Sequence, residues 1–416
     1  MKKINHIIRG KYLAIIAALF LLASCNKDVE QLAPIQTPVY PTGNGIAATL
    51  AADPNYSFYS AMITRSGLTA TLNDLTKSYT MFATDNAGMK LFVTAASGGA
   101  VPSGAPDAAF LGFISGVLPV ASAAGIIQYN TIGQKLPFDS IGSAFPNYPY
   151  TTLIVLDATQ PFVRMNIFPS KGSPYSYVNS LPVTAVGKVA ANGLIHTTYS
   201  VVAPPTATLK TVIATEPTLS YFRAAVARAD SGAVGLSRFD SLLNYGVTNM
   251  TVLAPNDAAF QTLVFGLVYS QVFAASGNAT LATATANGAV AAGPAFLSTN
   301  NVSTALVKGI VAYHLLASLT TSTTTPYQPN IRVFSNNIPA TSIFIKTLVN
   351  NGVAAHPGVM ATSTYAGPAV TSLKFASYGT FPPGGTPFSY SATAISKDKL
   401  AVNGVYHIID KVLLPQ

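Results

Sequence analysis

Four histidines beyond residue 25 are the side chains best suited to acid–base chemistry or metal binding: His196, His314, His356 and His407. A serine hydrolase would need Gly-x-Ser-x-Gly, a phosphate loop Gly-x-x-x-x-Gly-Lys-Ser/Thr and a zinc protease His-Glu-x-x-His, and none of these patterns occurs. The 14 acidic residues are spread along the chain and form no pair that indicates glycoside hydrolysis. We therefore expect no enzyme, no metal site and no cofactor.

The apolar surroundings of the histidines favour a structural role. In the run that follows Asn403-Gly404, strand alternation places His407 on one face with Val405 and Ile409. A histidine among aliphatic neighbours is typically a buried, hydrogen-bonded residue. We therefore expect His407 to belong to the core rather than to hold a ligand or act as a base.

The first 24 residues have the features of a targeting segment. An apolar run follows four basic residues, Lys2, Lys3, Arg9 and Lys11. The run ends at Leu22-Ala23-Ser24-Cys25, which resembles a bacterial lipobox, in which the cysteine takes a diacylglycerol before cleavage. We predict a lipoprotein signal peptide at 1–24 and a covalent lipid on Cys25, the chain's one cysteine. A plain secretory peptide and a single membrane anchor are the alternatives.

Cleavage would remove four of the 23 basic residues and leave 19 against 14 acidic ones. The remaining basic residues are scattered, so we expect no nucleic-acid binding. Residues 25–48 are rich in proline and glycine and are predicted to be a flexible tether. Their start, Asn26-Lys27-Asp28-Val29-Glu30, resembles the Lys-plus-acid tag that some Gram-negative bacteria use for surface export. We expect a lipid-anchored protein of the outer membrane, exposed at the cell surface.

An internal repeat organises the rest of the chain. With 416 residues, 49% of them apolar and 9% charged, the chain can form two or three domains, each with its own core. Three short patterns recur in the same order, at 80–87 and 251–258, at 125–130 and 309–316, and at 192–196 and 403–415. The first predicts a buried strand that ends at a helix cap, and the Asn-Gly of the third predicts a tight turn before a strand.

The second copy is longer than the first. Thr251 lies 171 residues after Thr80, whereas Asn403 lies 211 residues after Asn192. Two weakly charged stretches, 274–304 and 318–337, contain the additional residues. Their Ala/Thr/Gly and Thr/Pro composition favours surface loops over core. The uncharged stretch 108–127 is long enough to span a membrane, but its glycines and Pro119 favour buried core helices.

The repeated motifs resemble those of the fasciclin domain. The second copy carries Thr-Val-Leu-Ala-Pro-Asn-Asp-Ala-Ala-Phe from residue 251, Tyr313-His314, and a closing Asn-Gly-Val-Tyr-His-Ile-Ile-Asp-Lys-Val-Leu-Leu-Pro from residue 403. The first copy departs from the pattern, with Thr84 for proline and Asn130 for histidine. The resemblance implies an α+β fold of two tandem domains, a degenerate one at 49–213 and a second at 214–416. Each would be a β-wedge or sandwich of mixed strands packed with helices.

Tyrosines are the candidate interaction residues. In animal fasciclin-like adhesion proteins the block that matches Tyr313-His314 is associated with receptor contact. The alternative is structural, with Tyr313 packed and His314 bonded to the backbone. Four tyrosines in Pro-rich loops could instead anchor a partner or stack on a ligand, or simply decorate the surface: Tyr148, Tyr150, Tyr175 and Tyr177.

Two short Asp-Ser-aliphatic patterns resemble the O-glycosylation sequon of some surface-exporting bacteria. They contain Ser140 and Ser241. We predict these two serines as glycosylation sites, which an intact mass of the mature protein would disprove if it showed only lipid in excess of the polypeptide.

These observations favour a non-catalytic surface lipoprotein that mediates adhesion or protein–protein interaction. An accessory subunit held on an outer-membrane β-barrel, of the nutrient-import type, is a close alternative, because a lipid anchor raises the effective concentration near such a barrel. A polysaccharide-binding module is the third possibility. It would use loop tyrosines with Asn and Thr side chains, although the chain lacks tryptophan.

Overall fold

The computed structural model describes residues 39–142, 145, 147–172, 174–299, 302–317, 331–377 and 391–415. Within the chain, Thr42–Gln416 form one compact unit. The predicted signal peptide, Cys25 and most of the predicted tether lie outside the described residues, as does the greater part of the predicted insertion at 318–337.

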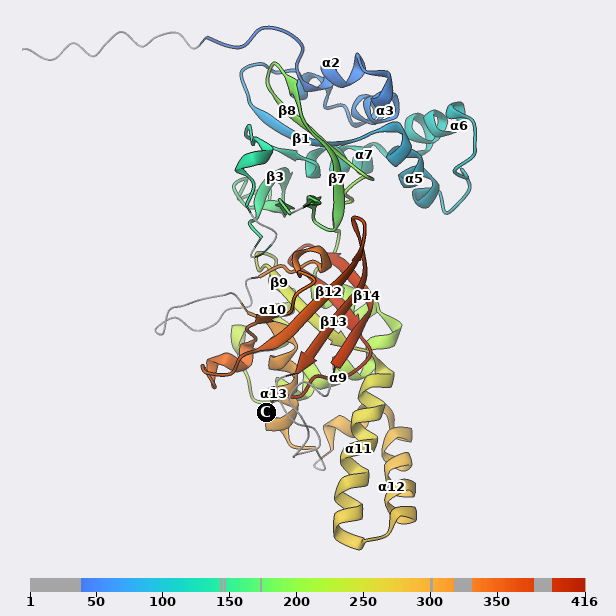
Figure 1. The fold of residues 1–416 in the computed structure, drawn as a ribbon, viewed down its shortest axis with the longest axis vertical. Coiled ribbons are helices and arrows are strands. Elements are labelled where there is room, and N and C mark those ends of the chain that lie inside the picture. Colours follow the sequence, from blue (N-terminus) through green and yellow to red (C-terminus); the bar gives the residue numbers. More distant parts are fainter. Residues whose placement is uncertain are drawn as a thin grey trace, which may run out of the picture. The chain divides into compact units, whose positions relative to one another are not determined.

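The first repeat is built on a mixed sheet of eight strands in the order β4-β3-β2-β1-β8-β7-β6-β5 (Figure 1). The strands are β1 (Tyr79–Thr84), β2 (Thr131–Ile132), β3 (Tyr150–Val155), β4 (Arg164–Ile167), β5 (Pro169–Ser170), β6 (Tyr177–Val178), β7 (Leu181–Ala190) and β8 (Gly193–Thr198). The helices are α2 (Ile46–Ala51), η1 (Pro54–Tyr56), α3 (Ser57–Ser66), α4 (Thr69–Leu72), α5 (Asn86–Ala96), α6 (Asp107–Gly112), η2 (Phe113–Val117), α7 (Val120–Tyr129) and η3 (Phe138–Ser140).

The second repeat has a sheet of seven strands in the order β10-β9-β15-β14-β13-β12-β11. The strands are β9 (Met250–Pro255), β10 (Leu315–Leu316), β11 (Ile343–Ile345), β12 (Val359–Ala366), β13 (Ala369–Ser377), β14 (Ser391–Ala401) and β15 (Gly404–Ile409). The helices are α8 (Leu209–Thr215), η4 (Pro217–Leu219), α9 (Ser220–Ala229), η5 (Gly235–Ser237), α10 (Phe239–Asn244), α11 (Asp257–Ser276), α12 (Ala279–Ala291), η6 (Gly293–Ser298), α13 (Thr304–Tyr313), η7 (Ser335–Asn337) and η8 (Leu348–Asn351).

A buried parallel pair of strands lies at the centre of each sheet. β1 pairs with β8 and β9 pairs with β15, and every residue of these four strands is buried. Parallel strands need cover on both faces, and both repeats provide it. Along β1, Met81 packs into one apolar cluster and Phe82 into another. Along β9, Val252 and Leu253 divide in the same way.

The strand-to-helix caps predicted from the repeat are confirmed. The Asp85 carboxylate accepts a hydrogen bond from the backbone N–H of Gly88 at 2.9 Å, at the start of α5. The Asn256 side chain accepts one from Ala259 at 2.8 Å, at the start of α11. Each cap satisfies a backbone donor that the helix itself leaves unpaired.

A threonine on each central strand holds the equivalent loop in both repeats. The Thr80 hydroxyl donates to the Gln134 carbonyl at 2.8 Å and accepts from the Leu136 N–H at 2.7 Å. Thr251 makes the same two bonds, at 2.5 and 2.9 Å, to a loop in the second repeat. The four central strands also have the same order, β2-β1-β8-β7 in the first sheet and β10-β9-β15-β14 in the second. Together these correspondences confirm an α+β fold of two tandem repeats, each of mixed strands packed with helices.

The prediction that 274–304 forms loops is wrong. α11 has 20 residues where its counterpart α5 has 11, and α12 and η6 follow it. Gly277, with φ of 63°, ends α11, and the Asn278 side chain caps α12. Alanine is the strongest intrinsic helix former, and a uniformly small, uncharged sequence carries too little periodicity to distinguish helix from loop.

The uncharged stretch at 108–127 forms helices that bury one face in the core, as expected, but the other face is exposed, with Val117 at 66% and Val120 at 51%. It comprises α6, η2 and α7, whose axes bend by 102° at a break around Pro119. Phe110, Ile114 and Ile127 lie in the main apolar cluster of the first repeat. Among the described residues, α11 is also long and apolar enough to cross a membrane by length and composition alone.

Ordered structure begins before the predicted end of the tether at residue 48. Helix α2 starts at Ile46, and Ile46 and Ala47 are buried. The reason is a contact distant in sequence, because the Ile46 N–H donates to the Asn192 side chain at 2.9 Å. A local Pro/Gly composition could not reveal this partner.

Candidate functional site

The Tyr313–His314 pair is enclosed at the end of α13. Both side chains have 0% exposure. The Tyr313 hydroxyl donates to the Gly358 carbonyl at 2.8 Å. His314 Nδ1 lies 2.8 Å from the Ile310 carbonyl, and its Nε2 accepts from the Leu413 N–H at 3.0 Å, which fixes a neutral ring protonated on Nδ1. The folded chain does not offer these side chains to a partner, so the structure corrects the receptor-contact interpretation in favour of the structural one.

Asn130 takes the place of His314 in the first repeat. Its side-chain amide donates to the Ile126 carbonyl at 2.9 Å, four residues back, as His314 Nδ1 does to Ile310. A second bond, to the Val202 carbonyl at 2.8 Å, ties the helix end to the segment after β8. The departure of the first copy from the sequence pattern therefore preserves the contact.

His314 should make the stability of the fold depend on pH. Burial lowers its pKa from 6.5 to about 4. Between these values the unfolded chain binds a proton that the folded chain does not, so the free energy of unfolding is intact above pH 6.5 and falls as the pH drops toward 4, by about 3 kcal/mol in all. His314→Asn places at this position the residue found at Asn130, and it should remove the part of the pH-dependent fall in the free energy of unfolding that His314 causes. Urea titrations of both proteins across this range measure the difference, and identical pH dependences would contradict the assignment.

His407 and His196 are bridges between a strand and a loop. His407 Nδ1 accepts from the Asp398 N–H at 3.2 Å, and Nε2 lies 3.0 Å from the Val333 carbonyl. His196 makes the equivalent contacts at 3.1 and 3.2 Å. Burial lowers the pKa of both rings. This is the core role expected for His407, and within the described ranges no three His, Cys, Asp or Glu side chains are grouped to hold a metal ion.

The four loop tyrosines lie in different environments. Tyr148 is 58% exposed, Tyr150 is half-buried in β3, Tyr175 is 39% exposed and Tyr177 is buried. Tyr175 and Tyr177 line one cavity, joined there by Tyr365 of β12, whereas Tyr148 and Tyr150 do not line it. Sequence reasoning missed Tyr365, which sits in an ordinary strand pattern.

The two predicted glycosylation sites differ in exposure. Ser140 is exposed at the end of η3, beside Asp139, whose carboxylate pairs with Lys171 at 2.8 Å. Ser241 is half-buried in α10. Ser140 is thus the more accessible of the two hydroxyls, and glycosylation of both remains a prediction.

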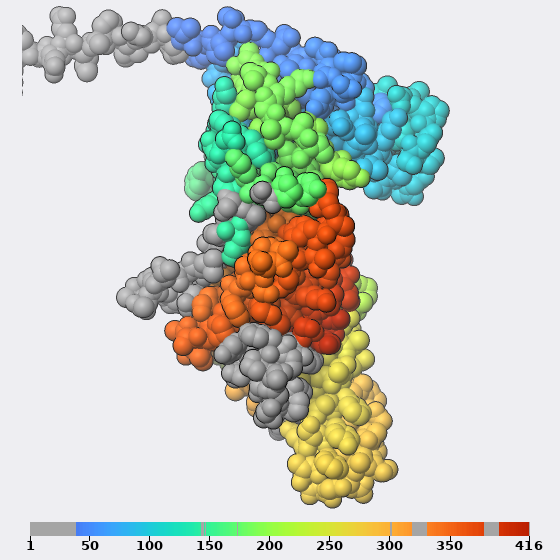
Figure 2. All heavy atoms as spheres, viewed as in Figure 1, coloured from blue at the N-terminus to red at the C-terminus, as the bar shows by residue number. Residues whose placement is uncertain are grey.

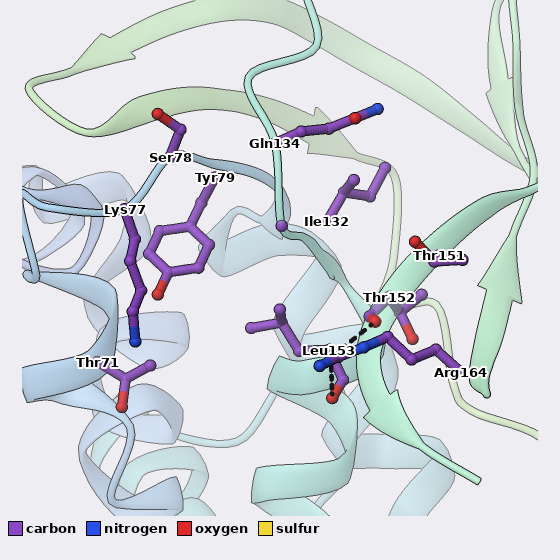
Figure 3. Close-up of a pocket in the computed structure, with 11 residues that line it drawn as sticks. Thr71, Lys77, Ser78, Tyr79, Ile132, Gln134, Thr151, Thr152, Leu153 and Arg164 are labelled. Atoms are coloured by element: carbon purple, nitrogen blue, oxygen red, sulfur yellow. Dashed lines mark hydrogen bonds between the residues drawn. The ribbon is translucent and has the colours of Figure 1, made fainter. Parts of the chain in front are cut away.

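A cavity of about 570 Å³ opens beside the sheet of the first repeat (Figure 3). Lys77 and Tyr79 lie on one side of it and Arg164 on the other. Arg164 donates to the Thr152 and Leu153 carbonyls at 3.5 and 3.2 Å. Both cations are engaged, since Lys77 also lies 3.6 Å from the Asp74 carboxylate. We therefore assign no ligand to this cavity.

A second cavity, of about 340 Å³, is the tyrosine cavity. Its lining consists of Gly172, Pro174, Tyr175, Tyr177, Asn336, Asn337, Pro339, Ala340, Tyr365 and Gly367. The Tyr177 hydroxyl donates to the Pro368 carbonyl at 2.9 Å, and the Tyr365 hydroxyl to the Ile338 carbonyl at 2.6 Å. Burial, with the neighbouring Tyr365 and Tyr175, raises the pKa of Tyr177 to about 12, so its phenol stays neutral.

The α11–α12 hairpin, residues 257–291, is seen in yellow at the lower end of Figure 2, and Asp257 at its start is its one charged residue. The sequence has no Asp, Glu, Lys, Arg or His between 258 and 307. Only 28% of the most apolar stretch of α11 is buried, and near the tip Phe273 and Leu281 are 44% and 50% exposed. Phe265, Tyr269 and Phe273 stack along α11 with ring centroids 5.9 and 5.8 Å apart.

No protein-family model matches the chain, and no curated protein sequence matches it. A comparison of structures finds similarity to the FAS1 domain pair of the insect cell adhesion molecule fasciclin I. The two share 12% sequence identity at a TM-score of 0.31, over 86% of this chain and 96% of that one.

Proposed function

We propose that this chain is a non-catalytic lipoprotein of the outer membrane, exposed at the cell surface, whose two fasciclin-like repeats mediate adhesion or protein–protein interaction. The lipobox-like Leu22-Ala23-Ser24-Cys25 supports a lipid anchor on Cys25. The motifs at 251–260 and 403–415 support membership of the fasciclin family. The tether predicted between Cys25 and the first repeat would leave both repeats free to present contact surfaces.

The α11–α12 hairpin carries this proposal. The cores of protein interfaces are depleted in charge and enriched in aromatic residues, because burying an unpaired charge is costly. The hairpin combines exposed Phe273 and Leu281 with a complete absence of charged residues between 258 and 307. Its counterpart in the first repeat, α5, is too short to form such a surface. We infer that the second repeat makes the principal contact.

A second candidate function uses the same surface. An uncharged, partly aromatic hairpin suits a partner surface of similar composition, such as the aromatic girdle of an outer-membrane β-barrel at the membrane interface. The chain would then be an accessory subunit, held near the barrel by the lipid on Cys25. The two functions differ in the partner and share the contact residues.

Charging the hairpin should release the partner. We expect Phe273→Asp with Leu281→Asp to lower partner recovery about tenfold or more, because two exposed apolar anchors become charges that must be desolvated. The matched control is Val234→Asp with Leu236→Asp, which are 79% and 57% exposed outside the hairpin. The measurement is quantitative mass spectrometry after mild-detergent purification of tagged protein from native membranes.

The outcome separates the candidates. A β-barrel protein recovered in fixed stoichiometry with wild type and control, and lost with the hairpin variant, would favour the accessory subunit. Another surface protein with the same dependence would favour adhesion. Equal recovery with all three proteins would contradict the hairpin as the contact surface.

A further inference from the structure

The tyrosine cavity has the architecture of a small-ligand site. Its volume of about 340 Å³ lies at the lower end of the range for ligand pockets. Residues from both repeats form it, with Tyr175 and Tyr177 from the first and Asn336 and Tyr365 from the second. The Asn147 side-chain amide, from the first repeat, donates to the Asn337 side chain at 2.9 Å and helps to hold this arrangement.

Two residues that line the cavity carry three buried amide atoms that have no protein partner in the described part of the chain. They are Oδ1 and Nδ2 of Asn336 and Nδ2 of Asn337. The two residues are only 4% and 2% exposed. Leaving a buried polar atom unsatisfied costs about 1–3 kcal/mol. The buried Asn403 differs from them, because its side-chain oxygen and its side-chain nitrogen are both bonded to the backbone.

The chemistry of the lining defines the ligand class. None of the residues that line the cavity is charged. The unpartnered amides offer both donors and an acceptor, and the hydroxyls of Tyr177 and Tyr365 are already engaged, which leaves their rings as walls. Tyr175 faces Gly367, since a Cβ at that glycine would lie 3.9 Å from the Tyr175 hydroxyl. A complementary ligand is neutral, carries hydroxyls that donate and accept, and has an apolar face for an aromatic ring.

We propose that the tyrosine cavity binds a neutral saccharide unit. Sugar hydroxyls pair with the Asn336 and Asn337 amides, and the C–H face of the ring packs on Tyr175. The site is separate from the α11–α12 hairpin and does not depend on the function proposed for that hairpin. It gives the protein a glycan subsite where its two repeats meet.

Isothermal titration with three neutral probes, cellotriose, maltotriose and mannotriose, tests the proposal on the whole mature chain. At least one should bind wild type. Tyr175→Ala should weaken that binding about tenfold or more through loss of ring contact, and Asn336→Leu by a similar factor through loss of a net hydrogen bond. Tyr199→Ala removes an equally accessible ring, 54% exposed, outside the cavity and should leave binding unchanged.

A further variant keeps the test valid if the Asn336→Leu protein misfolds. Ala340→Trp places a large side chain at an exposed edge of the cavity lining and should abolish binding while the melting temperature stays within a few degrees of wild type. The proposal is overturned if none of the three probes binds wild type, which would indicate a cavity filled by water alone. It is also overturned if binding survives in both Tyr175→Ala and Ala340→Trp.

Discussion

Gly404→Ala is expected to destabilise the second repeat severely. A Cβ at this position would lie 2.4 Å from the Met250 carbonyl oxygen and 2.4 Å from Leu209 Cδ1. The carbonyl belongs to the backbone of β9, the parallel partner of β15, so relief requires the two central strands to separate. We expect a loss of about 3 kcal/mol or more in the free energy of unfolding, measured by urea titration followed by circular dichroism.

The first repeat contains an equivalent glycine, and helix α11 contains a control glycine. Gly193 holds the equivalent place in the first repeat, where a Cβ would lie 2.1 Å from the Tyr79 carbonyl oxygen, so Gly193→Ala should cost as much. A Cβ at Gly266, inside α11, would instead enter open space, and Gly266→Ala should be neutral or stabilise by up to about 1 kcal/mol. A Gly404→Ala protein as stable as Gly266→Ala would refute the steric account.

Asn403→Ala is the second large effect. The Asn403 side chain accepts from the Leu209 N–H at 2.8 Å and donates to the Leu243 and Tyr245 carbonyls at 2.9 and 3.0 Å. Alanine would leave these backbone groups unpaired at a buried site. Since each costs about 1–3 kcal/mol, we expect a total loss of about 3–5 kcal/mol in the free energy of unfolding.

The same measurement on the first repeat tests whether the asparagine of the Asn-Gly motif stabilises the fold through its buried hydrogen bonds. Asn192 accepts from the Ile46 N–H and donates to the Leu72 and Asp74 carbonyls, at 2.9, 2.9 and 3.0 Å. Asn192→Ala should therefore behave like Asn403→Ala. Asn287→Ala, at an exposed position of α12, is the control and should change stability little. If Asn403→Ala matched that control, the buried hydrogen bonds would not be what holds the motif.

The sequence predicts the central strands well because their signals are local. The buried runs at 80–84 and 251–255 end at polar residues that cap helices, and both caps occur as expected. Tight turns precede β8 and β15 as expected, but they consist of Ala191-Asn192 and Val402-Asn403, and the glycine of each Asn-Gly motif is the first residue of the strand. The further role of Asn403 has no local signal, because its partner Leu243 is 160 residues away in sequence.

Other features depend on tertiary contacts that no local pattern contains. Tyr175 can be named as a candidate from the sequence, but Asn336 cannot, because their proximity requires both repeats to be folded. The burial of Tyr313–His314 likewise follows from contacts with Gly358 and Leu413, distant in the chain. The sequence wrongly predicts loops for much of the α11–α12 hairpin because small uncharged residues suit either structure.

The hairpin's part in adhesion is tested most directly by the aggregation of cells. Three sets of cells would display, at equal surface density, the full wild-type chain, the Phe273→Asp/Leu281→Asp variant or the Val234→Asp/Leu236→Asp control. Each set would be mixed with unmodified cells, and the size of the aggregates would be followed over time. We predict that wild type and control aggregate to the same extent and that the hairpin variant does not. Aggregation by the hairpin variant at the wild-type rate would contradict the proposal that this uncharged surface makes the adhesive contact.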